Sequence, residues 1–303
     1  MTRRFAILAW SAAACTYLLI VLGGVVRITG SGMGCGDHWP LCNGHLFPPL
    51  NDIGTVIEWS HRLVAALVSV LVVALAAYGW WLDRRRRFVN PGLAPGVGTP
   101  TATFAAVGLL VLQILLGAIT VKLELPAWTV ILHLGTAMLL LATLLLAARG
   151  GAQHAAPLHV SLIVLTFVTV LFGALTANLG AAGACGGFPL CNGQIWITGG
   201  PRALIQWLHR LLAYSLAVVA VLWAIVSRGR APFIVVGLVA LQVSIGAATV
   251  LLGLPAALQV AHVAVGTAVW GTVVLVAVVA QRDSAERPGA SEAHRVLGGL
   301  RSE

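Results

Sequence analysis

The amino-acid sequence predicts an all-α integral membrane protein whose eight transmembrane helices form two tandem, pseudo-symmetric four-helix bundles. The first observation is composition: the 303 residues are 59% hydrophobic and only 9% charged, with a mean hydropathy of +0.96. An average soluble domain has about 25% charged residues. The second observation is a series of long apolar segments, and the third is that the second half of the chain repeats the first.

Each predicted helix is an apolar segment of the length that a bilayer requires. About 20 apolar residues in a helix cross a hydrocarbon core of roughly 30 Å. The expected spans lie near residues 6–26, 57–81, 103–122, 128–148, 158–178, 204–226, 232–252 and 256–280. No soluble domain of useful size fits between them, so any chemistry must be housed among the helices or in the loops that join them.

The internal repeat divides these helices into two groups of four. EWSHRLVA at residues 58–65 returns as QWLHRLLA at 206–213, and LQILLGAITVKLELPAWTVILH aligns without a gap with LQVSIGAATVLLGLPAALQVAH. An even number of helices per repeat gives both halves the same orientation, related by an axis along the membrane normal. The predicted organisation is 1–82 (helices one and two with a Cys loop), 83–102 (a basic, Pro/Gly-rich cytoplasmic linker), 103–150 (helices three and four), 151–282 (the second bundle) and 283–303 (a polar cytoplasmic tail).

Basic residues indicate the orientation in the membrane, because Lys and Arg in short loops favour the cytoplasmic side. Most of the 18 Lys and Arg residues fall on one side of the predicted helices. They are Arg3, Arg4, Arg84, Arg85, Arg86, Arg87, Arg149, Arg228, Arg230, Arg282, Arg287, Arg295 and Arg301. We therefore expect a protein of the cell membrane with both termini in the cytoplasm. The run Arg84–Arg87 is interpreted as a membrane-surface anchor that contacts anionic lipid, and no nucleic-acid partner is expected.

Four of the five cysteines lie in the two long loops of the opposite, outer face. Cys35 and Cys42 occur in CGDHWPLCNG, and Cys185 and Cys191 in CGGFPLCNG. The outer compartment is oxidising, which favours one disulfide in each loop. A metal site is the alternative, but the two loops do not both provide a partner histidine. Cys15, within the first helix, is interpreted as a small buried apolar residue.

Four histidines recur at one depth in the predicted helices. His61 and His133 in the first half correspond to His209 and His262 in the second, each about five residues inside its apolar span. A single histidine in an apolar helix is more often a packing residue than a ligand. Ionisable residues within the membrane are nevertheless candidates for function, and here the same pair occurs twice. Zinc or copper would require further ligands, whereas a heme iron needs only two imidazoles, so we predict two heme sites.

An acidic residue distinguishes the two halves. Glu58 precedes His61 by three residues and so lies on roughly the same face of its helix, whereas Gln206 takes this place in the second half. Gln keeps the hydrogen-bonding shape but has neither charge nor titratable proton. We therefore predict that only the first site exchanges protons with a reacting group. The alternative is a carboxylate that pairs with Arg62 or Arg27 for packing.

Arg62 and Arg210 directly follow the first histidine of each half. Either they bind heme propionates that face the outer surface, or they extend to lipid phosphates. The sequence leaves both interpretations open.

From about residue 5 to residue 282 the chain resembles the heme A synthase family. The motifs that carry this resemblance are GCGDHWPLCNG, EWSHR, the GAITV…LPAW…H segment and their degenerate second copies. The resemblance implies an oxidoreductase that converts the C8 methyl group of heme O to the formyl group of heme A, through hydroxylated intermediates, for a terminal oxidase. It also implies heme O, heme A, membrane lipid, heme O synthase and terminal oxidase assembly factors as partners.

The resemblance assigns roles to individual residues. It implies that Glu58 is the essential acid and that the outer-loop pair Cys35–Cys42 is either redox-active or structural. The heme ligands it implies are His61 and His133 for heme O, the substrate, and His209 and His262 for heme b, a permanent cofactor.

Two other classes of protein compete with this interpretation. A non-catalytic di-heme b cytochrome that carries electrons from quinol would share the four histidines, but it does not explain why only one half has Glu58. A transporter built from parallel repeats would place polar residues near the middle of the membrane. The central stretches of these helices are almost wholly Leu, Val and Ala, and Gln113 and Gln242 are the main exceptions. The sequence therefore favours the enzyme over the transporter and the electron carrier.

Overall fold

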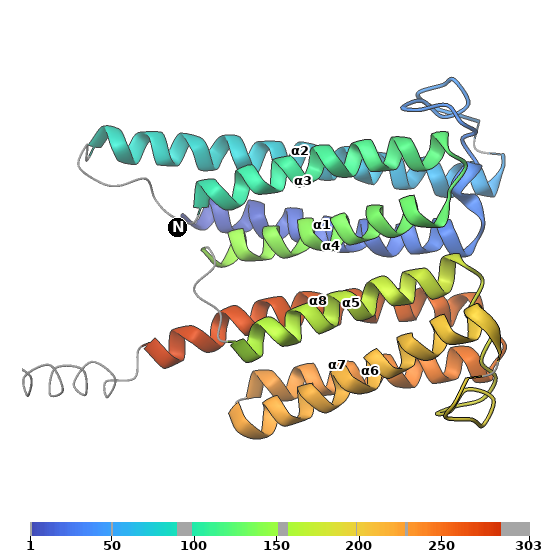
Figure 1. Cartoon of the computed structure of the whole chain (residues 1–303). Coiled ribbons are helices and arrows are strands. Elements are labelled where there is room, and N and C mark those ends of the chain that lie inside the picture. Colours follow the sequence, from blue (N-terminus) through green and yellow to red (C-terminus); the bar gives the residue numbers. More distant parts are fainter. Residues whose placement is uncertain are drawn as a thin grey trace, which may run out of the picture.

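The computed structural model describes residues 2–49, 51–89, 99–150, 157–197, 199–227 and 230–285. Within these ranges the chain is helical and forms no β-strand, which confirms the predicted all-α class. The elements are α1 (Arg3–Ile28), the 3-10 turn η1 (Ser31–Met33), α2 (Ile53–Val89), α3 (Thr99–Lys122), α4 (Ala127–Arg149), α5 (Pro157–Asn178), α6 (Gly200–Ser227), α7 (Arg230–Leu251) and α8 (Ala256–Ala285) (Figure 1).

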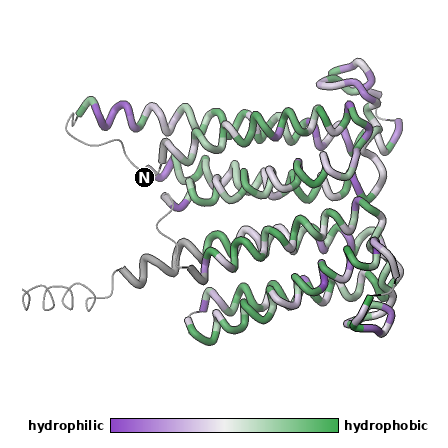
Figure 2. The backbone as a smooth tube through the Cα atoms, viewed as in Figure 1, coloured by the Kyte–Doolittle hydropathy of each residue, from purple (hydrophilic) through white to green (hydrophobic). Residues whose placement is uncertain are grey.

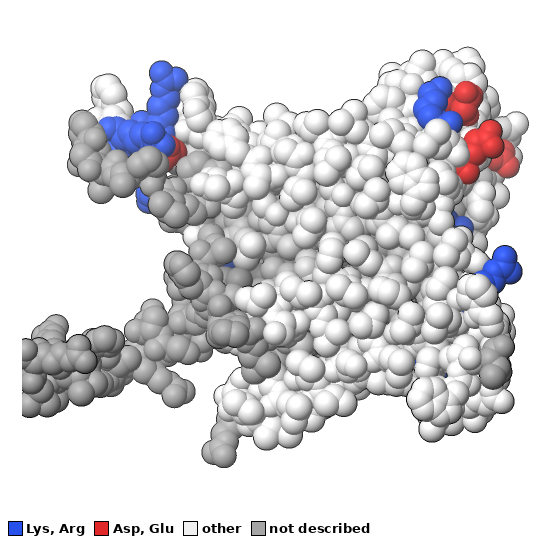
Figure 3. All heavy atoms as spheres, viewed as in Figure 1, with Lys and Arg blue, Asp and Glu red and all other residues white. Residues whose placement is uncertain are grey.

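All eight helices of the described ranges are long and apolar enough to cross a bilayer, and the chain is a multi-pass membrane protein. Hydrophobic residues cover the helices along most of their length, while hydrophilic residues gather toward their ends (Figure 2). On the face drawn in Figure 3, charged side chains occur only toward these two ends. Large apolar side chains such as Leu67, Val218 and Ile225 are exposed, as expected of surfaces that contact lipid.

The helices pack as two groups of four (Figure 1). In the first group the neighbours are α1–α2, α2–α3, α3–α4 and α4–α1, so that α2 and α4 are diagonal to each other. In the second group α5–α6, α6–α7, α7–α8 and α8–α5 are neighbours, and α6 and α8 are diagonal. The two groups meet through α1, α4, α5 and α8, which places two parallel bundles side by side.

Hydrogen bonds join the two bundles. The indole N–H of Trp270 donates to the carbonyl of Met138 at 2.8 Å, and the hydroxyl of Tyr17 donates to the carbonyl of Ala264 at 3.0 Å. Arg27 of α1 donates to the side chain of Asn178 at the end of α5. Each of these bonds crosses from one half of the sequence to the other, so the interface is specified by polar groups as well as by apolar contact.

The two long loops that carry the cysteines lie at the same end of the molecule, opposite to the N-terminus (Figure 1). We call this end the loop end. At the other end, α2 continues beyond the predicted boundary at residue 82, through Arg84–Arg87, to Val89. Of the predicted linker, residues 90–98 lie outside the described residues, as do residues 286–303 of the predicted tail.

Cation–π contacts and an ion pair accompany the extension of α2. Arg84 lies over the ring of Trp80 and Arg85 over that of Trp81, each 5.2 Å from the ring centre, and Arg87 pairs with Asp83 one turn earlier. Such i,i+4 contacts stabilise a helix at the membrane surface, where the hydropathy signal ends. The arginines predicted to begin the linker are therefore part of the helix.

Candidate functional site

Each of the two long loops is closed by a disulfide at the loop end. Cys35 is bonded to Cys42, and Cys185 to Cys191, with Cα–Cα distances of 4.4 and 4.6 Å. All four cysteines are buried. The structure therefore joins both pairs predicted from the sequence and leaves Cys15 as a free thiol within α1.

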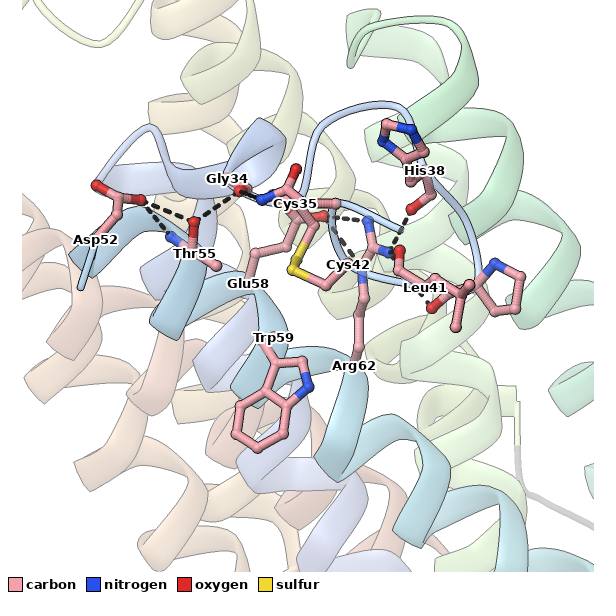
Figure 4. The surroundings of a disulfide bond; sticks show 12 residues. Gly34, Cys35, His38, Leu41, Cys42, Asp52, Thr55, Glu58, Trp59 and Arg62 are labelled. Carbon is pink, nitrogen blue, oxygen red and sulfur yellow. Dashed lines mark hydrogen bonds and ion pairs between the residues drawn. A yellow bond between two sulfur atoms is a disulfide. The ribbon is translucent and has the colours of Figure 1, made fainter. Parts of the chain in front are cut away.

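The loop of the first half is attached to α2 through Glu58 (Figure 4). This residue is only 3% exposed. Its Oε2 accepts a hydrogen bond of 2.8 Å from the backbone N–H of Cys35. Its Oε1 accepts bonds of 2.5 and 3.2 Å from the guanidinium of Arg62, one turn further along α2. The predicted acid is thus ion-paired and in direct contact with the disulfide loop.

Arg62 extends from this ion pair to the far side of the same loop. Its Nη1 donates to the carbonyl of His38 at 2.7 Å and to that of Leu41 at 2.5 Å (Figure 4). Arg62 therefore pairs with Glu58, which was the alternative interpretation of that carboxylate from the sequence. Its bonds to the loop carbonyls were not predicted. Together the two side chains hold both ends of the disulfide-closed segment against α2.

The second half repeats this arrangement without the ion pair. Gln206 is also 3% exposed, and its Oε1 accepts a bond of 2.5 Å from the backbone N–H of Cys185. Its Nε2 donates to the carbonyl of Ala182 at 2.7 Å. Arg210 donates instead to the carbonyls of Leu190 and Cys185, at 2.8 and 3.0 Å. An amide therefore holds the second loop as a carboxylate holds the first.

A second contact between loop and helix occurs at the start of α2. The carboxylate of Asp52 accepts bonds from the backbone N–H and hydroxyl of Thr55, at 2.7 and 2.9 Å. These bonds hold the pKa of Asp52 below its ordinary value. The Thr55 hydroxyl also contacts the carbonyl of Gly34 at 2.8 Å. A Cβ on Gly34 would lie 2.4 Å from the backbone of Gly54, so this close approach requires glycine.

The four predicted histidines lie on the diagonal helices of the two bundles. His61 is on α2 and His133 on α4, whereas His209 is on α6 and His262 on α8. All four histidines are part-buried. The rings of His209 and His262 are 6.4 Å apart between their centres and inclined at 80°. His209 and His262 are thus neighbours between α6 and α8, and His61 and His133 hold the corresponding positions on α2 and α4.

The hydrogen bonds of these rings differ. Nδ1–H of His209 donates to the carbonyl of Thr169 at 3.2 Å, which leaves Nε2 available as a ligand. The amide of Gln113 donates to Nε2 of His133, also at 3.2 Å. Within the described part of the chain, Nδ1 of His61, His133 and His262 has no hydrogen-bond partner. Buried polar atoms without partners are uncommon and mark sites where another group is expected.

The donor set suits a heme better than a bare metal ion. Two metal–imidazole bonds of about 2.0 Å, with about 1.1 Å from each nitrogen to its ring centre, give a ring separation of roughly 6 Å. The separation of 6.4 Å between His209 and His262 agrees with this value. In the ranges that the structure describes, no three residues of the types His, Cys, Asp and Glu form a metal-binding cluster. Two imidazoles are enough for a heme iron, because the porphyrin supplies the other four nitrogens.

Several residues that contact these rings were not predicted from the sequence. Gln113 was noted only as a polar residue near the middle of the membrane, and the carbonyl of Thr169 carries no side-chain signal. The glycines that contact the histidines were also missed. Gly117 and Gly246 keep register with His133 and His262 in the repeat, a regularity that could have suggested contact.

The chain is similar to known proteins over most of its length. A model of the family described as cytochrome oxidase assembly protein (COX15-CtaA) matches residues 6–274. The heme A synthase of Bacillus licheniformis is 34% identical, over 66% of this chain and 68% of that protein. That of Geobacillus kaustophilus is 31% identical, over 84% of this chain and 86% of its own length. That of an Exiguobacterium species (strain AT1b) is 28% identical, over 90% and 92%.

Proposed function

Because the chain belongs to the COX15-CtaA family of cytochrome oxidase assembly proteins, we propose that it is a heme A synthase, which oxidises the C8 methyl group of heme O to the formyl group of heme A. The observation that carries the proposal is an asymmetry between two otherwise similar bundles. Each has one histidine on each of two diagonal helices, but among the described residues only the first has an ion-paired acid, Glu58, next to its disulfide loop.

We assign the substrate to the first bundle and a resident cofactor to the second. His61 and His133 would bind heme O, and His209 and His262 would bind heme b. The ring separation in the second bundle and the corresponding positions of the first pair support a heme site in each bundle, and Glu58 in place of Gln206 supports the choice of the first bundle for the substrate. When bound, heme b supplies one-electron redox chemistry. The hydrogen bond from His209 to Thr169 would fix the ring tautomer that a permanent ligand requires.

Glu58 is the proposed catalytic residue of the first bundle. With water as the oxygen source, converting a methyl group to a formyl group consumes one water, passes four electrons to an acceptor and releases four protons, with the alcohol as the two-electron intermediate. A carboxylate near the reacting substituent can accept a proton or stabilise positive charge as it develops. Gln206, which makes the equivalent loop contact in the second bundle, can do neither.

We further propose that the loop end faces the outside of the cell membrane and that the N-terminus lies in the cytoplasm. In the described residues the end opposite to the loops carries Arg3, Arg4, Arg84–Arg87 and Arg149, which fits the preference of basic residues for the cytoplasmic side. Disulfides at the loop end fit an oxidising compartment. Heme O synthase and terminal oxidase assembly factors are the proposed protein partners.

The competing interpretation is a di-heme b cytochrome that transfers electrons from quinol. It requires the same four histidines, and in it the Glu58–Arg62 ion pair would only hold the loop. The comparisons do not favour it, because the relatives reported above are named heme A synthases.

Identification of the bound hemes separates the two functions. The full-length protein would be purified after expression with and without a heme O synthase, and its hemes extracted and identified by mass spectrometry. We expect heme b in both preparations, and heme A or its alcohol precursor only when heme O is supplied. Two equivalents of heme b and no modified heme in the presence of heme O would reject the synthase and support the electron carrier.

A further inference from the structure

Each of the four histidines contacts a glycine on the helix that precedes its own helix in the chain. The contact is to the Cε1 edge of the imidazole in all four cases. The pairs are Gly23 with His61, Gly117 with His133, Gly173 with His209, and Gly246 with His262. The same glycine–histidine contact therefore occurs twice in each half of the chain, and the four glycines lie in four different helices.

These contacts would crowd a side chain on the glycine. A Cβ at Gly23 or Gly117 would lie 3.2 Å from Cε1 of the ring, and one at Gly173 or Gly246 would lie 3.0 Å from it. Distances of 3.0–3.4 Å are tighter than nine in ten real Cβ contacts, so the ring would have to shift. Glycine within a helix is unfavourable compared with alanine. Its presence at all four positions is explained by this close approach of ring to backbone.

Other glycines of the same helices show that the contact is specific. A Cβ at Gly108 of α3, or at Gly237 of α7, would meet no atom of another described segment within 4 Å. These two positions are equivalent in the repeat, as Gly117 and Gly246 are. Among the described residues, each of the helices α3 and α7 therefore offers one glycine whose added Cβ would meet a histidine and one whose added Cβ would meet no other residue, which provides a matched control.

The ring of His209 has a second contact that fixes its orientation. Its Nδ1–H donates to the carbonyl of Thr169, one turn before Gly173 on α5. Gly173, which has no side chain, and this carbonyl lie on the same face of α5. The ring is therefore held both by close packing against the backbone and by a hydrogen bond. For His61 and His262, the Nδ1 atoms have no partner within the described residues, and the glycine contact remains.

We propose that Gly23, Gly117, Gly173 and Gly246 are positioning residues that set the ring orientation of the four histidines, an inference that rests on their proposed heme ligation. Cε1 lies between Nδ1 and Nε2, so its contact with the backbone of the neighbouring helix restricts the directions in which both ring nitrogens point. Alanine at these positions displaces or rotates the ring, and a ligand bond to iron tolerates little displacement. The effect therefore falls on heme binding.

The second bundle allows the most direct test, because its heme is the resident one. The full-length protein carrying Gly246→Ala would be compared with the wild type and with Gly237→Ala, using heme content per protein, the electron paramagnetic resonance spectrum of the ferric heme and the rate of heme transfer to apomyoglobin. For Gly246→Ala we expect heme loss about tenfold faster than in the control and shifted g values, since overpacking displaces the ligand ring. For Gly237→Ala we expect wild-type behaviour. Equal behaviour of the two alanine variants would overturn the inference.

Two further variants separate this outcome from other failures. His262→Ala tests ligation itself: an unchanged heme spectrum in this variant would reject the proposed ligand, and the glycine inference with it. If Gly246→Ala does not yield monodisperse protein, the double variant Gly246→Ala/His262→Ala decides. Recovery of monodisperse protein would support a clash with the imidazole, because removing the ring removes the clash. Continued aggregation would place the clash elsewhere and overturn the inference.

Discussion

The carboxylate of Glu58 accepts a hydrogen bond of 2.8 Å from the backbone N–H of Cys35, and thereby connects the proposed catalytic acid to the disulfide loop. The equivalent bond in the second bundle runs from Cys185 to the amide oxygen of Gln206, at 2.5 Å. The two bundles therefore share one way of holding a loop and differ in the charge of the group that holds it. This difference makes the second bundle an internal control for the first.

The first prediction concerns Glu58→Gln. Because Gln206 already holds a loop through the same backbone bond, glutamine at position 58 should keep the loop in place and leave heme binding intact. Heme A formation should fall by at least about 100-fold, the lower range for the loss of a general acid or base. The measurement is the yield of heme A by mass spectrometry in cells that supply heme O. The matched control is Gln206→Asn, which should keep most of the activity. Wild-type yields from Glu58→Gln would remove this carboxylate from the mechanism.

The sequence was sufficient to predict the helices, which hydropathy reports directly, and both disulfides, which follow from two pairs of loop cysteines on an oxidising side. The internal repeat placed the four histidines on corresponding helices, and their ligation of heme stays a prediction. It was not sufficient for the contacts of Glu58 and Arg62 with the loop, since these involve the N–H of Cys35 and the carbonyls of His38 and Leu41. Backbone groups leave no mark in the sequence, and only the folded loop brings them to α2.

The end of α2 illustrates a different limit. Hydropathy marks the point at which a helix leaves the apolar core, and it ended the predicted span near residue 81. The helix continues to Val89, because arginine is a good helix former and Arg84 and Arg85 pack on Trp80 and Trp81. Hydropathy therefore locates the membrane boundary of a helix and not its last residue.

The second prediction concerns the ion pair. Arg62→Ala leaves the buried carboxylate of Glu58 without its cationic partner, which should lower the free energy of unfolding by about 2 kcal/mol, a value reduced for partial exposure of the pair. Arg210→Ala removes only bonds to backbone carbonyls and should cost less. Thermal unfolding in detergent would compare the two variants. In Arg62→Ala/Glu58→Gln the uncompensated charge is gone, so part of the loss should be recovered. Failure of this recovery would show that the ion pair is not the cause.

The third prediction separates stability from activity at the two disulfides. The paired cysteines are 7 and 6 residues apart, so the chain-entropy model gives each bond a similar contribution of about 2.5 kcal/mol. Replacing either pair with serine should therefore lower the melting temperature by similar amounts. Only Cys35→Ser/Cys42→Ser should also lower heme A formation, because only that loop is bonded to Glu58. Equal losses of activity from the two replacements would indicate that both loops act on stability alone.

The fourth prediction assigns the two hemes to the two bundles. His209→Ala and His262→Ala should each remove heme b, because either variant leaves the iron with only one of its two protein ligands. His61→Ala and His133→Ala should leave heme b in place and abolish retention of heme O. Heme extraction from each purified variant, after expression with heme O supplied, measures both contents at once. Because the two histidines of a pair would bind the same heme, we expect the two variants of a pair to behave alike and the two pairs to differ. Loss of both hemes from every variant would mean that the bundles do not bind them independently, and the division into a substrate site and a cofactor site would be wrong.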